Sequence, residues 1–352
     1  MLPEHFVGWD LGGAHLKAAH MDAQGHVLSV LQLPCPLWQG LEPLREGIDR
    51  VVDRFECSES HHAITMTGEL ADLFSSRVEG VRTLTGIMAE RLAHGTISLF
   101  AGAQGFLQPK DARSHAEAIA SNNWLASATF VAQCLPQALF IDIGSTTTDV
   151  VLTSEGQVAA CGRNDNERLR CGELLYTGVV RTPLMALARE APFAGEWVPL
   201  MAENFAVTAD IYRLTSELPE HADILASADN EPKTIMASAR RLARMLGLDL
   251  DAGSPGQWRR LAAYFSRQQL NSIEQTCDLH TARNSLSDEA PLVGAGVGRF
   301  LAERLARRLG RPYIDLQSLL NTDLLLAGHP ADCAPAVAVA DLARRAVRDT
   351  TC

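Results

Sequence analysis

The sequence predicts a two-lobed α/β fold, and three observations support that prediction. The chain has 352 residues, more than one compact core usually holds. A strand–turn–strand pattern occurs twice, about 130 residues apart, which is about the length of one lobe. After the second copy the apolar residues recur mainly at helical spacing. We therefore expect a first lobe over residues 1–137 and a second lobe with a helical insertion over residues 138–352.

The repeated pattern is an apolar strand that ends in Asp-x-Gly, followed by a tight turn and two more strands. The first copy carries Asp10-Leu11-Gly12-Gly13, and the second carries Asp142-Ile143-Gly144-Ser145. Glycine permits a close turn whose N–H groups can face an anion. A single copy would fit an ordinary hairpin equally well. Two copies at this separation favour a pair of phosphate-binding turns.

The residues expected to bind phosphate are Gly12, Gly13, Lys17, Gly144, Ser145, Thr146 and Thr147. Serine and threonine add hydroxyl donors to the backbone N–H groups. A carboxylate ahead of such a turn repels phosphate but can hold Mg²⁺ that bridges to it. We therefore expect Asp10 and Asp142 to be metal ligands and part of the catalytic site.

Lys17 and Asp149 stand at the same offset from the leading aspartate of their copies. Lys17 would contact phosphate, although a solvated strand lysine is an equal alternative. Asp149 would act as a base or support the metal. Arg181 would clamp a phosphate or carboxylate with its planar guanidinium, or else pair on a helix. Asp149 and Arg181 complete the predicted catalytic set.

A third glycine-rich segment includes Gly294, Gly296 and Gly298, just before a predicted helix over residues 299–309. It resembles a dinucleotide-binding fingerprint, with Asp315 about 20 residues on. Arg299 stands where the third fingerprint glycine belongs, and too little chain follows to complete a dinucleotide domain. We interpret the three glycines as a nucleotide- or substrate-binding turn. Close packing of a strand against a helix is the alternative.

Bulk composition limits the classes of partner. The formal net charge of -11 argues against nucleic acid and against an anionic membrane surface. Eight scattered cysteines form no C-x-x-C pair, and the first ten residues lack the pattern of a signal peptide. No apolar run reaches membrane-spanning length. We expect a cytoplasmic protein with a small phosphorylated substrate, and a homodimer is left open.

The sequence also predicts helices over residues 69–76, 114–134, 173–191, 206–217, 233–246 and 255–277. Segments 192–199 and 219–232, each bounded by proline, are expected to be loops.

The two Asp-x-Gly turns and the later glycine turn, in this order and spacing, resemble the actin/heat-shock-70/sugar-kinase superfamily over nearly the whole chain. The resemblance implies the actin-like ATPase (ASKHA) fold of two ribonuclease H-like lobes with a central cleft. It also implies Mg²⁺ as a cofactor, with ATP as a second candidate. In this superfamily the two Asp-x-Gly turns hold phosphates and the later glycine turn contacts adenosine.

Further stretches resemble one branch, the hydantoinase A/oxoprolinase-like proteins encoded with tetrahydromethanopterin-linked one-carbon pathways. They are Gly8–Lys17, Thr65–Asp72, Asn123–Ala128, Gly172–Pro183, Ala209–Leu214 and Ala239–Gly247. Archaeal members act in methanofuran biosynthesis, and bacterial members are expected to serve the related methylofuran. The resemblance implies a transferase that joins an aminomethyl-furan methyl diphosphate to a glutamyltyramine-type phenol and releases diphosphate. His15, Gly68 and Asn230 stand where the branch has Asn, a small residue such as Ala, and Gly.

Several assignments remain open at this point. Glu69, Asp72 and Glu173 are candidate bases for the phenol, although each is as readily explained by a helix N-terminus. Trp9 and Trp124 would stack on an aromatic substrate or pack in the core. An ATP-dependent small-molecule kinase or oxoprolinase-type ATPase is the main alternative function. An actin-like filament or chaperone subunit is a further, non-enzymatic one.

Overall fold

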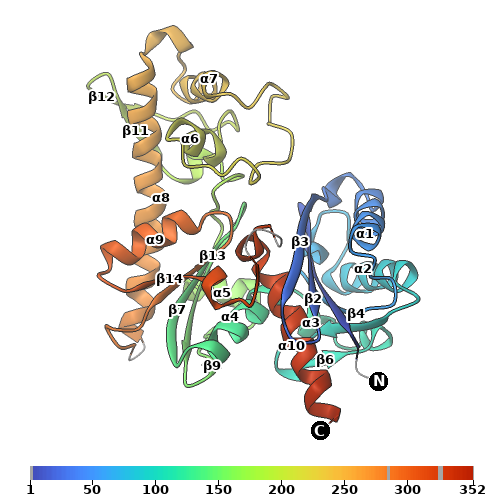
Figure 1. The fold of residues 1–352 in the computed structure, drawn as a ribbon. Helices are drawn as coiled ribbons and strands as arrows, with labels where there is room; N and C mark the ends of the chain where they lie inside the picture. Colours follow the sequence, from blue (N-terminus) through green and yellow to red (C-terminus); the bar gives the residue numbers. More distant parts are fainter. Residues whose placement is uncertain (1–2, 284–285, 324–327, 352) are drawn as a thin grey trace. The chain divides into compact units, whose positions relative to one another are not determined.

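The computed structural model describes residues 3–283, 286–323 and 328–351 (Figure 1). The chain divides into two compact units. Unit 1 comprises Met1–Ala138, Thr153–Ala159 and Asp315–Cys352, and unit 2 comprises Leu139–Leu152 and Ala160–Ile314. Each unit has its own mixed sheet, so the predicted two-lobed α/β fold is confirmed. The predicted cleft between the lobes concerns their relative placement and stays a prediction.

Unit 1 is built on a sheet with the order β3-β2-β1-β4-β5-β6. Strands β1, β2 and β3 are antiparallel, β1, β4 and β5 are parallel, and β6 is antiparallel to β5. The strands are β1 (His5–Leu11), β2 (His15–Asp22), β3 (Val27–Pro34), β4 (His61–Met66), β5 (Thr96–Phe100) and β6 (Phe106–Leu107). The helices are α1 (Glu42–Phe55), α2 (Arg77–Arg91), α3 (Ala116–Ile119), α4 (Asn123–Cys134) and α10 (Ala334–Thr351), and the 3₁₀ turns that matter below are η1 (Leu37–Gln39), η2 (Gly68–Leu70) and η8 (Pro330–Cys333).

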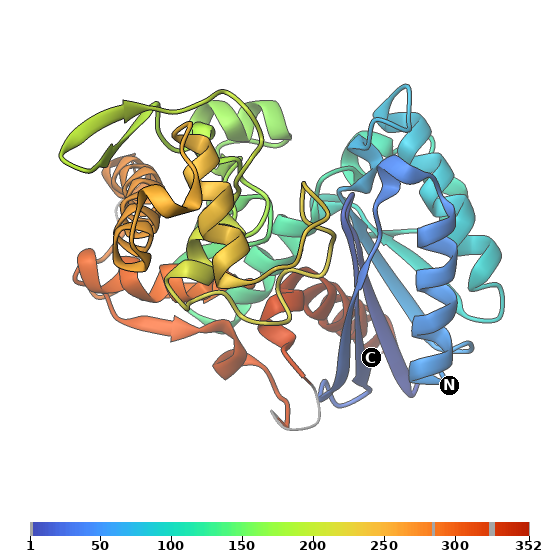
Figure 2. The same ribbon diagram turned by 90° about the horizontal axis from the view of Figure 1, so that it is seen from above.

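Successive residues of β1 point to opposite faces of this sheet, and the two faces pack against different helices. Val7, Trp9 and Leu11 are buried in one core with side chains of α1 and α2. Gly8 points to the opposite face, where its Cα lies under α10: a Cβ there would come within 1.9 Å of the carbonyl oxygen of Ala336. Figure 1 shows α10 in red along the blue strands, and Figure 2 shows α1 on the other side of them. The end of the chain, expected in the second lobe, thus belongs to unit 1.

Unit 2 repeats the same beginning. Its sheet has the order β10-β8-β7-β13-β14, and the short β9 (Gln157–Val158) pairs with β8. The strands are β7 (Gln137–Ile143), β8 (Thr148–Ser154), β10 (Leu174–Leu175), β13 (Leu292–Ala295) and β14 (Tyr313–Asp315), with a separate hairpin of β11 (Glu190–Phe193) and β12 (Glu196–Pro199). The helices are α5 (Asp165–Cys171), α6 (Thr208–Leu214), α7 (Ile235–Met245), α8 (Pro255–Arg283) and α9 (Arg299–Arg308).

Three sequence-based helix predictions are wrong. Residues 69–76 form only the end of η2 and a connection of turns and bends, and α2 begins after Ser76, whose side chain caps it. Residues 114–134 are interrupted by Ser121, which has a φ of 52°. Residues 173–191 form β10, a loop and a 3₁₀ turn. N–H groups of this segment donate to carbonyl oxygens of the second Asp-x-Gly turn, as described below, instead of forming a helix. The expected loop at 192–199 is the β11–β12 hairpin.

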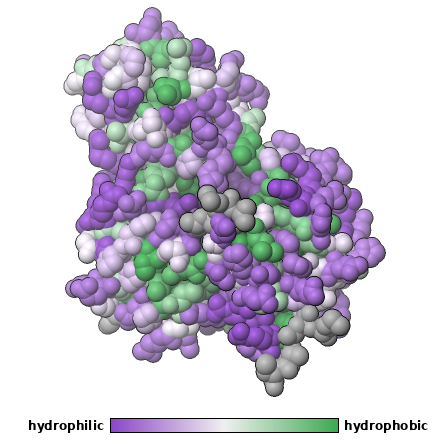
Figure 3. Space-filling view, in the orientation of Figure 1, coloured by the Kyte–Doolittle hydropathy of each residue, from purple (hydrophilic) through white to green (hydrophobic). Residues whose placement is uncertain are grey.

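The face of the protein drawn in Figure 3 is mostly hydrophilic, with hydrophobic residues in separate patches. Within the described residues, no helix combines the length and the apolar composition needed to cross a membrane. Cys352 lies outside the described residues.

Candidate functional site: two Asp-x-Gly turns

The first Asp-x-Gly turn closes tightly in unit 1. The N–H of Gly12 donates to the carbonyl of His15 at 3.0 Å, which sets β2 back antiparallel against β1. Asp10 is buried on β1 and pairs in register with Lys17 on β2 and with Thr65 on β4. Paired residues on neighbouring strands share one face of the sheet. The structure therefore brings the predicted carboxylate and the predicted lysine to the same place.

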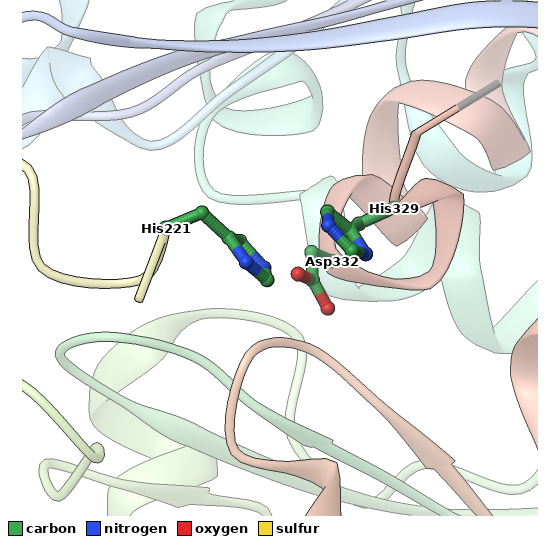
Figure 4. A group of neighbouring side chains, drawn as sticks. All are labelled: His221, His329 and Asp332. Atoms are coloured by element: carbon green, nitrogen blue, oxygen red, sulfur yellow. The ribbon is translucent and has the colours of Figure 1, made fainter. Parts of the chain in front are cut away.

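Lys17 has a defined contact in unit 1. Its Nζ donates to the backbone carbonyl of Asp332 at 2.8 Å, in η8 directly before α10. Figure 4 shows the side chains of Asp332 and His329 close together at this turn, and their ligand-type atoms lie within 4.8 Å of one another. His221, drawn in the same figure, belongs to unit 2. Lys17 is thus held at the N-terminal end of α10 as well as beside Asp10.

Two 3₁₀ turns flank the Gly12–Gly13 backbone. The N–H of Leu37 in η1 donates to Gly13 at 3.1 Å, and the N–H of Thr67, just before η2, donates to Leu11 at 3.0 Å. At Gly68 a Cβ would lie 2.7 Å from Cδ1 of Leu37 and 3.0 Å from the carbonyl oxygen of Leu11. The close approach explains why this position carries glycine rather than a larger residue.

The second Asp-x-Gly turn repeats the first in unit 2. The N–H of Gly144 donates to the carbonyl of Thr147 at 2.9 Å, so the turn has the same offset as Gly12 and His15. Ser145, Thr146 and Thr147 are half-buried, and Asp142 is half-buried at the end of β7. The equivalent geometry supports the idea that the two copies bind the same kind of group.

A segment that the sequence predicts to be helical instead wraps the second turn. The N–H of Val179 donates to Gly144 at 3.0 Å, and those of Val180 and Arg181 both donate to Ser145, at 3.1 and 2.9 Å. At Gly178 a Cβ would lie 2.5 Å from the backbone of Ser145 and Thr146. Arg181 therefore sits directly beside the turn, and burial lowers the pKa of its guanidinium.

This wrapping segment is fixed from behind by a buried glutamine on α8. The Nε2 of Gln269 donates to Oγ1 of Thr177 at 2.8 Å and to the carbonyl of Gly178 at 2.9 Å. Tyr212 and Gln269 share a further hydrogen bond of 2.5 Å. No local pattern in the sequence points to Gln269, since its partners lie about 90 residues away along the chain.

The later glycine turn also reaches Asp142. Strand β13 runs parallel to β7 with Ala295 opposite Asp142, and the N–H of Gly298 donates to Ile143 at 2.8 Å. Gly296 has a φ of 79°, and a Cβ on it would lie 2.4 Å from Oδ1 of Asp142 and 2.3 Å from the carbonyl oxygen of Ile143. Glycine is thus required at this position both for its backbone conformation and for space. The predicted nucleotide- or substrate-binding turn and the second phosphate turn form one constellation within unit 2.

Asp149 lies in a charged network rather than at an open position. Its Oδ1 accepts from Nη1 of Arg168 at 2.9 Å, and Arg168 is almost fully buried. The Nη2 of Arg168 donates to the backbone carbonyl of Glu173, whose carboxylate accepts the N–H groups of Cys161 and Gly162. Burial raises the pKa of the Asp149 carboxyl, and the Arg168 guanidinium opposes that rise. The network ties strand β8 and helix α5 to Glu173, just before β10, and to the Cys161–Gly162 backbone.

The remaining candidate residues differ in how far their side chains are exposed to solvent. Trp9 and Trp124 are core residues, 0% and 4% exposed, and Trp9 donates to His62. Glu69 is buried and accepts from Ser121 at 2.7 Å, whereas Asp72 is exposed. The tryptophan that is exposed next to a candidate turn is Trp38, which the sequence analysis did not single out.

The residues present are suitable for a divalent metal ion. Mg²⁺ prefers carboxylate oxygens and retained water. Each turn supplies an aspartate at the end of its strand, and at Asp142 the glycine backbone of Gly296 leaves open the space that any side chain would fill. Asp10 and Asp142 are the residues that would hold the ion, each described within its own unit.

Comparison with known proteins agrees with these features. The family model described as hydantoinase/oxoprolinase matches residues 61–345. A protein of Methanocaldococcus jannaschii, named (4-{4-[2-(γ-L-glutamylamino)ethyl]phenoxymethyl}furan-2-yl)methanamine synthase, is 27% identical over 283 residues, which cover 80% of this chain and 83% of that protein. A protein of the same name from Methanococcus vannielii is 34% identical over 125 residues, covering 35% of this chain and 56% of that one.

Among solved structures, a ROK family glucokinase from Streptomyces griseus is similar with a TM-score of 0.48 and 17% identity, covering 97% of this chain and 99% of that one. The family model spans well over half of the chain, and it includes the second turn, the segment that wraps it and the later glycine turn. The chain belongs to the hydantoinase/oxoprolinase family.

Proposed function

We propose that this protein is a transferase of methanofuran or methylofuran biosynthesis. It would join an aminomethyl-furan methyl diphosphate to the phenol of a glutamyltyramine-type acceptor and release diphosphate. The observation that carries the proposal is the similarity over 80% of the chain to a synthase whose printed name describes such a phenoxymethyl-furan product. The two Asp-x-Gly turns provide the anion-binding groups that this chemistry needs.

The protein's contribution to the reaction is to bind the leaving group. The N–H groups of residues 145–147 and the hydroxyls of Ser145, Thr146 and Thr147 would donate to the diphosphate, with Arg181 beside them. In unit 1, Lys17 and the N–H of Gly13 would offer the same chemistry. Such donors stabilise the charge that accumulates on diphosphate as the bond breaks. Mg²⁺, when bound, would neutralise part of the diphosphate charge.

The proposed step is balanced without a redox partner. The bond between the furan methylene carbon and the bridging oxygen breaks, and its electron pair leaves with diphosphate. The phenol oxygen forms the new C–O bond, and the phenol proton is released. Mg²⁺ is the proposed cofactor and a small phosphorylated molecule the proposed substrate, in the cytoplasm; the acidic composition disfavours nucleic acid as a partner.

A nucleotide-dependent kinase or ATPase is the second candidate, because the glycine turn at 294–298 adjoins Asp142. The named relatives do not favour it. In a transferase this turn would serve to pack β13 against β7 and to leave space around Asp142.

The test is a direct assay with the purified protein, Mg²⁺, aminomethyl-furan methyl diphosphate and γ-glutamyltyramine. We expect stoichiometric formation of the ether and diphosphate. Thermal stabilisation by diphosphate with Mg²⁺, larger than that by ATP, should accompany it, since a ligand that binds only the folded state raises the melting temperature. ATP-dependent phosphate release with no ether would overturn the proposal.

A further inference from the structure

We propose that Trp38, together with Leu70, forms an aromatic subsite beside the Gly12–Gly13 turn that holds the furan ring of the diphosphate donor. The indole face would stabilise the positive charge that develops on the furan methylene carbon. This inference rests on the proposed function and names where one part of the substrate lies.

The first step of the argument is the way both residues are anchored. Trp38 follows Leu37, which is 0% exposed and whose N–H is bound to Gly13. Leu70 follows Glu69, which is 1% exposed, in η2. This turn begins directly after Thr67, whose N–H donates to the carbonyl of Leu11. The turns that carry both residues are thus fixed to the first Asp-x-Gly turn by backbone hydrogen bonds.

The second step is exposure. Trp38 is 47% exposed and Leu70 is 48% exposed, although the residue before each of them is buried. The turns that carry them touch, because a Cβ on Gly68 would lie 2.7 Å from Cδ1 of Leu37. An apolar surface next to an anion-binding turn suits a ligand that carries an aromatic ring close to a phosphate.

The third step is the geometry of the donor. Its furan ring is separated from the diphosphate by a single methylene group, so a diphosphate on Gly12–Gly13 must leave the ring within a few ångströms of the turn. The second turn has different surroundings, where the wrapping segment brings Arg181. The first turn is therefore the one whose neighbours match the ring.

The fourth step is charge. When the C–O bond breaks, its electron pair goes to diphosphate, and the methylene carbon and the furan oxygen share the positive charge until the phenol oxygen bonds. An indole face attracts a cation lying within about 6 Å of the ring centre, and tryptophan does so more strongly than phenylalanine or tyrosine. Because the charge exists only in the transition state, the indole would act on kcat more than on KM.

The experiment compares Trp38→Leu, Trp38→Phe and the control Trp197→Leu. Trp197 is also exposed, at 60%, but it lies on β12 in unit 2 and contacts Tyr264. We expect Trp38→Leu to lose about tenfold in kcat, the loss to be smaller in Trp38→Phe, and Trp197→Leu to match the wild type. Thermal stabilisation by inorganic diphosphate with Mg²⁺ should be the same in all of them.

Fluorine supplies a readout that a purely structural role would not affect. Uniform 5-fluorotryptophan weakens the negative face of the indole, so it should lower kcat in the wild-type background and leave kcat unchanged in the Trp38→Phe background. In the ¹⁹F spectrum, the Trp38 signal, assigned by its absence in Trp38→Phe, should shift with the furan diphosphate and not with inorganic diphosphate.

The outcomes separate the two proposals. If the wild type forms no ether, the proposed function fails. If it forms the ether and Trp38→Leu keeps full kcat, the aromatic subsite is refuted. If Trp38→Leu instead changes the sedimentation coefficient, with its loss of activity following the change in assembly, the patch is a contact between copies of the chain and the inference is also overturned.

Discussion

Nη1 of Arg168 lies 2.9 Å from Oδ1 of Asp149, and the same guanidinium donates to the backbone of Glu173. Arg168 is 1% exposed and the side chain of Asp149 is 13% exposed, so the pair is largely shielded from solvent. Arg168→Met would leave two carboxylates buried without their cation, and we expect a loss of about 3–5 kcal/mol in the free energy of unfolding.

Urea unfolding measures this loss. Arg308→Met is the matched control, since Arg308 pairs with Glu274 at 2.8 Å but both side chains are about one-third exposed. The control should lose less than about 1 kcal/mol. If the two variants lose the same free energy of unfolding, the buried Arg168–Asp149 pair stabilises the protein no more than the exposed pair does.

The two motif aspartates should be essential for activity and dispensable for folding. Asp10→Asn and Asp142→Asn each remove the charge that would hold Mg²⁺ while keeping the volume of the side chain. Ether formation should fall by at least about 100-fold, with Mg²⁺-dependent stabilisation by diphosphate lost. Exposed Asp72→Asn is the control. Full activity in either motif variant would refute the metal assignment.

Gly178 should be required for the shape of the second turn. An added Cβ would lie 2.5 Å from the backbone of Ser145 and Thr146, so Gly178→Ala must push the turn outward. We expect diphosphate affinity, measured by calorimetry with Mg²⁺, to fall by about tenfold or more. Gly86→Ala, at an exposed position of α2 with nothing within 4 Å, should keep the affinity and add about 0.5–1 kcal/mol of stability. Unchanged affinity in Gly178→Ala would mean that the turn does not bind diphosphate in the observed geometry.

Gly8 should be required for α10 to pack against the sheet of unit 1. Its Cα lies so near α10 that a Cβ would meet the carbonyl oxygen of Ala336 at 1.9 Å. Gly8→Ala should therefore lower the free energy of unfolding by about 3 kcal/mol, the upper end of overpacking effects. Gly13→Ala, with nothing within 4 Å, is the stability control. A Gly8→Ala protein as stable as the control would argue against the placement of α10.

Buried His62 should make the protein sensitive to acid. Burial lowers the pKa of His62 to about 4 from the ordinary 6.5. Below pH 6.5 the unfolded chain takes up a proton that the folded protein refuses until about pH 4, so stability is lost as the pH falls through this window and then levels off. The total is on the order of 3 kcal/mol.

His62→Asn removes the titration and keeps an acceptor for Nε1 of Trp9, which donates to His62 at 3.2 Å. The difference in unfolding free energy between pH 7.5 and pH 4.5 should shrink accordingly. The exposed His94→Asn should behave as the wild type does. A variant with the same pH dependence as the wild type would exclude His62 as the cause.

The repeated strand–turn–strand pattern could be predicted from the sequence because all the residues that define it lie close together along the chain. An apolar strand, an Asp-x-Gly turn and a second strand lie within about 20 residues, and the backbone bonds Gly12 to His15 and Gly144 to Thr147 confirm both turns. The strand and the helix predicted on either side of the glycines at 294–298 are also present, as β13 and α9.

The wrapping segment could not be read in the same way. Residues 173–191 carry apolar residues at helical spacing, yet the N–H groups of Val179, Val180 and Arg181 go to Gly144 and Ser145. Long-range bonds that replace a helix leave no periodic trace in the sequence. The sequence also does not indicate which tryptophan is exposed. Trp9 is buried in the core and Trp38 in η1 is exposed, and only the folded structure distinguishes them. By contrast, Asn230 has a φ of 55°, a conformation that asparagine tolerates, which explains how it replaces the expected glycine.

The placement of α10 has a consequence for how the protein is made. Strands β1 and β2 are synthesised before unit 2, whereas α10, which covers Gly8, is synthesised after it. Until α10 has left the ribosome, one face of β1 and β2 lacks the cover that this helix provides, although unit 2 can already fold. A nascent chain of this kind should depend on chaperones that shield exposed strands, and a chain that stops short of residue 334 should be a substrate for degradation rather than a shortened enzyme.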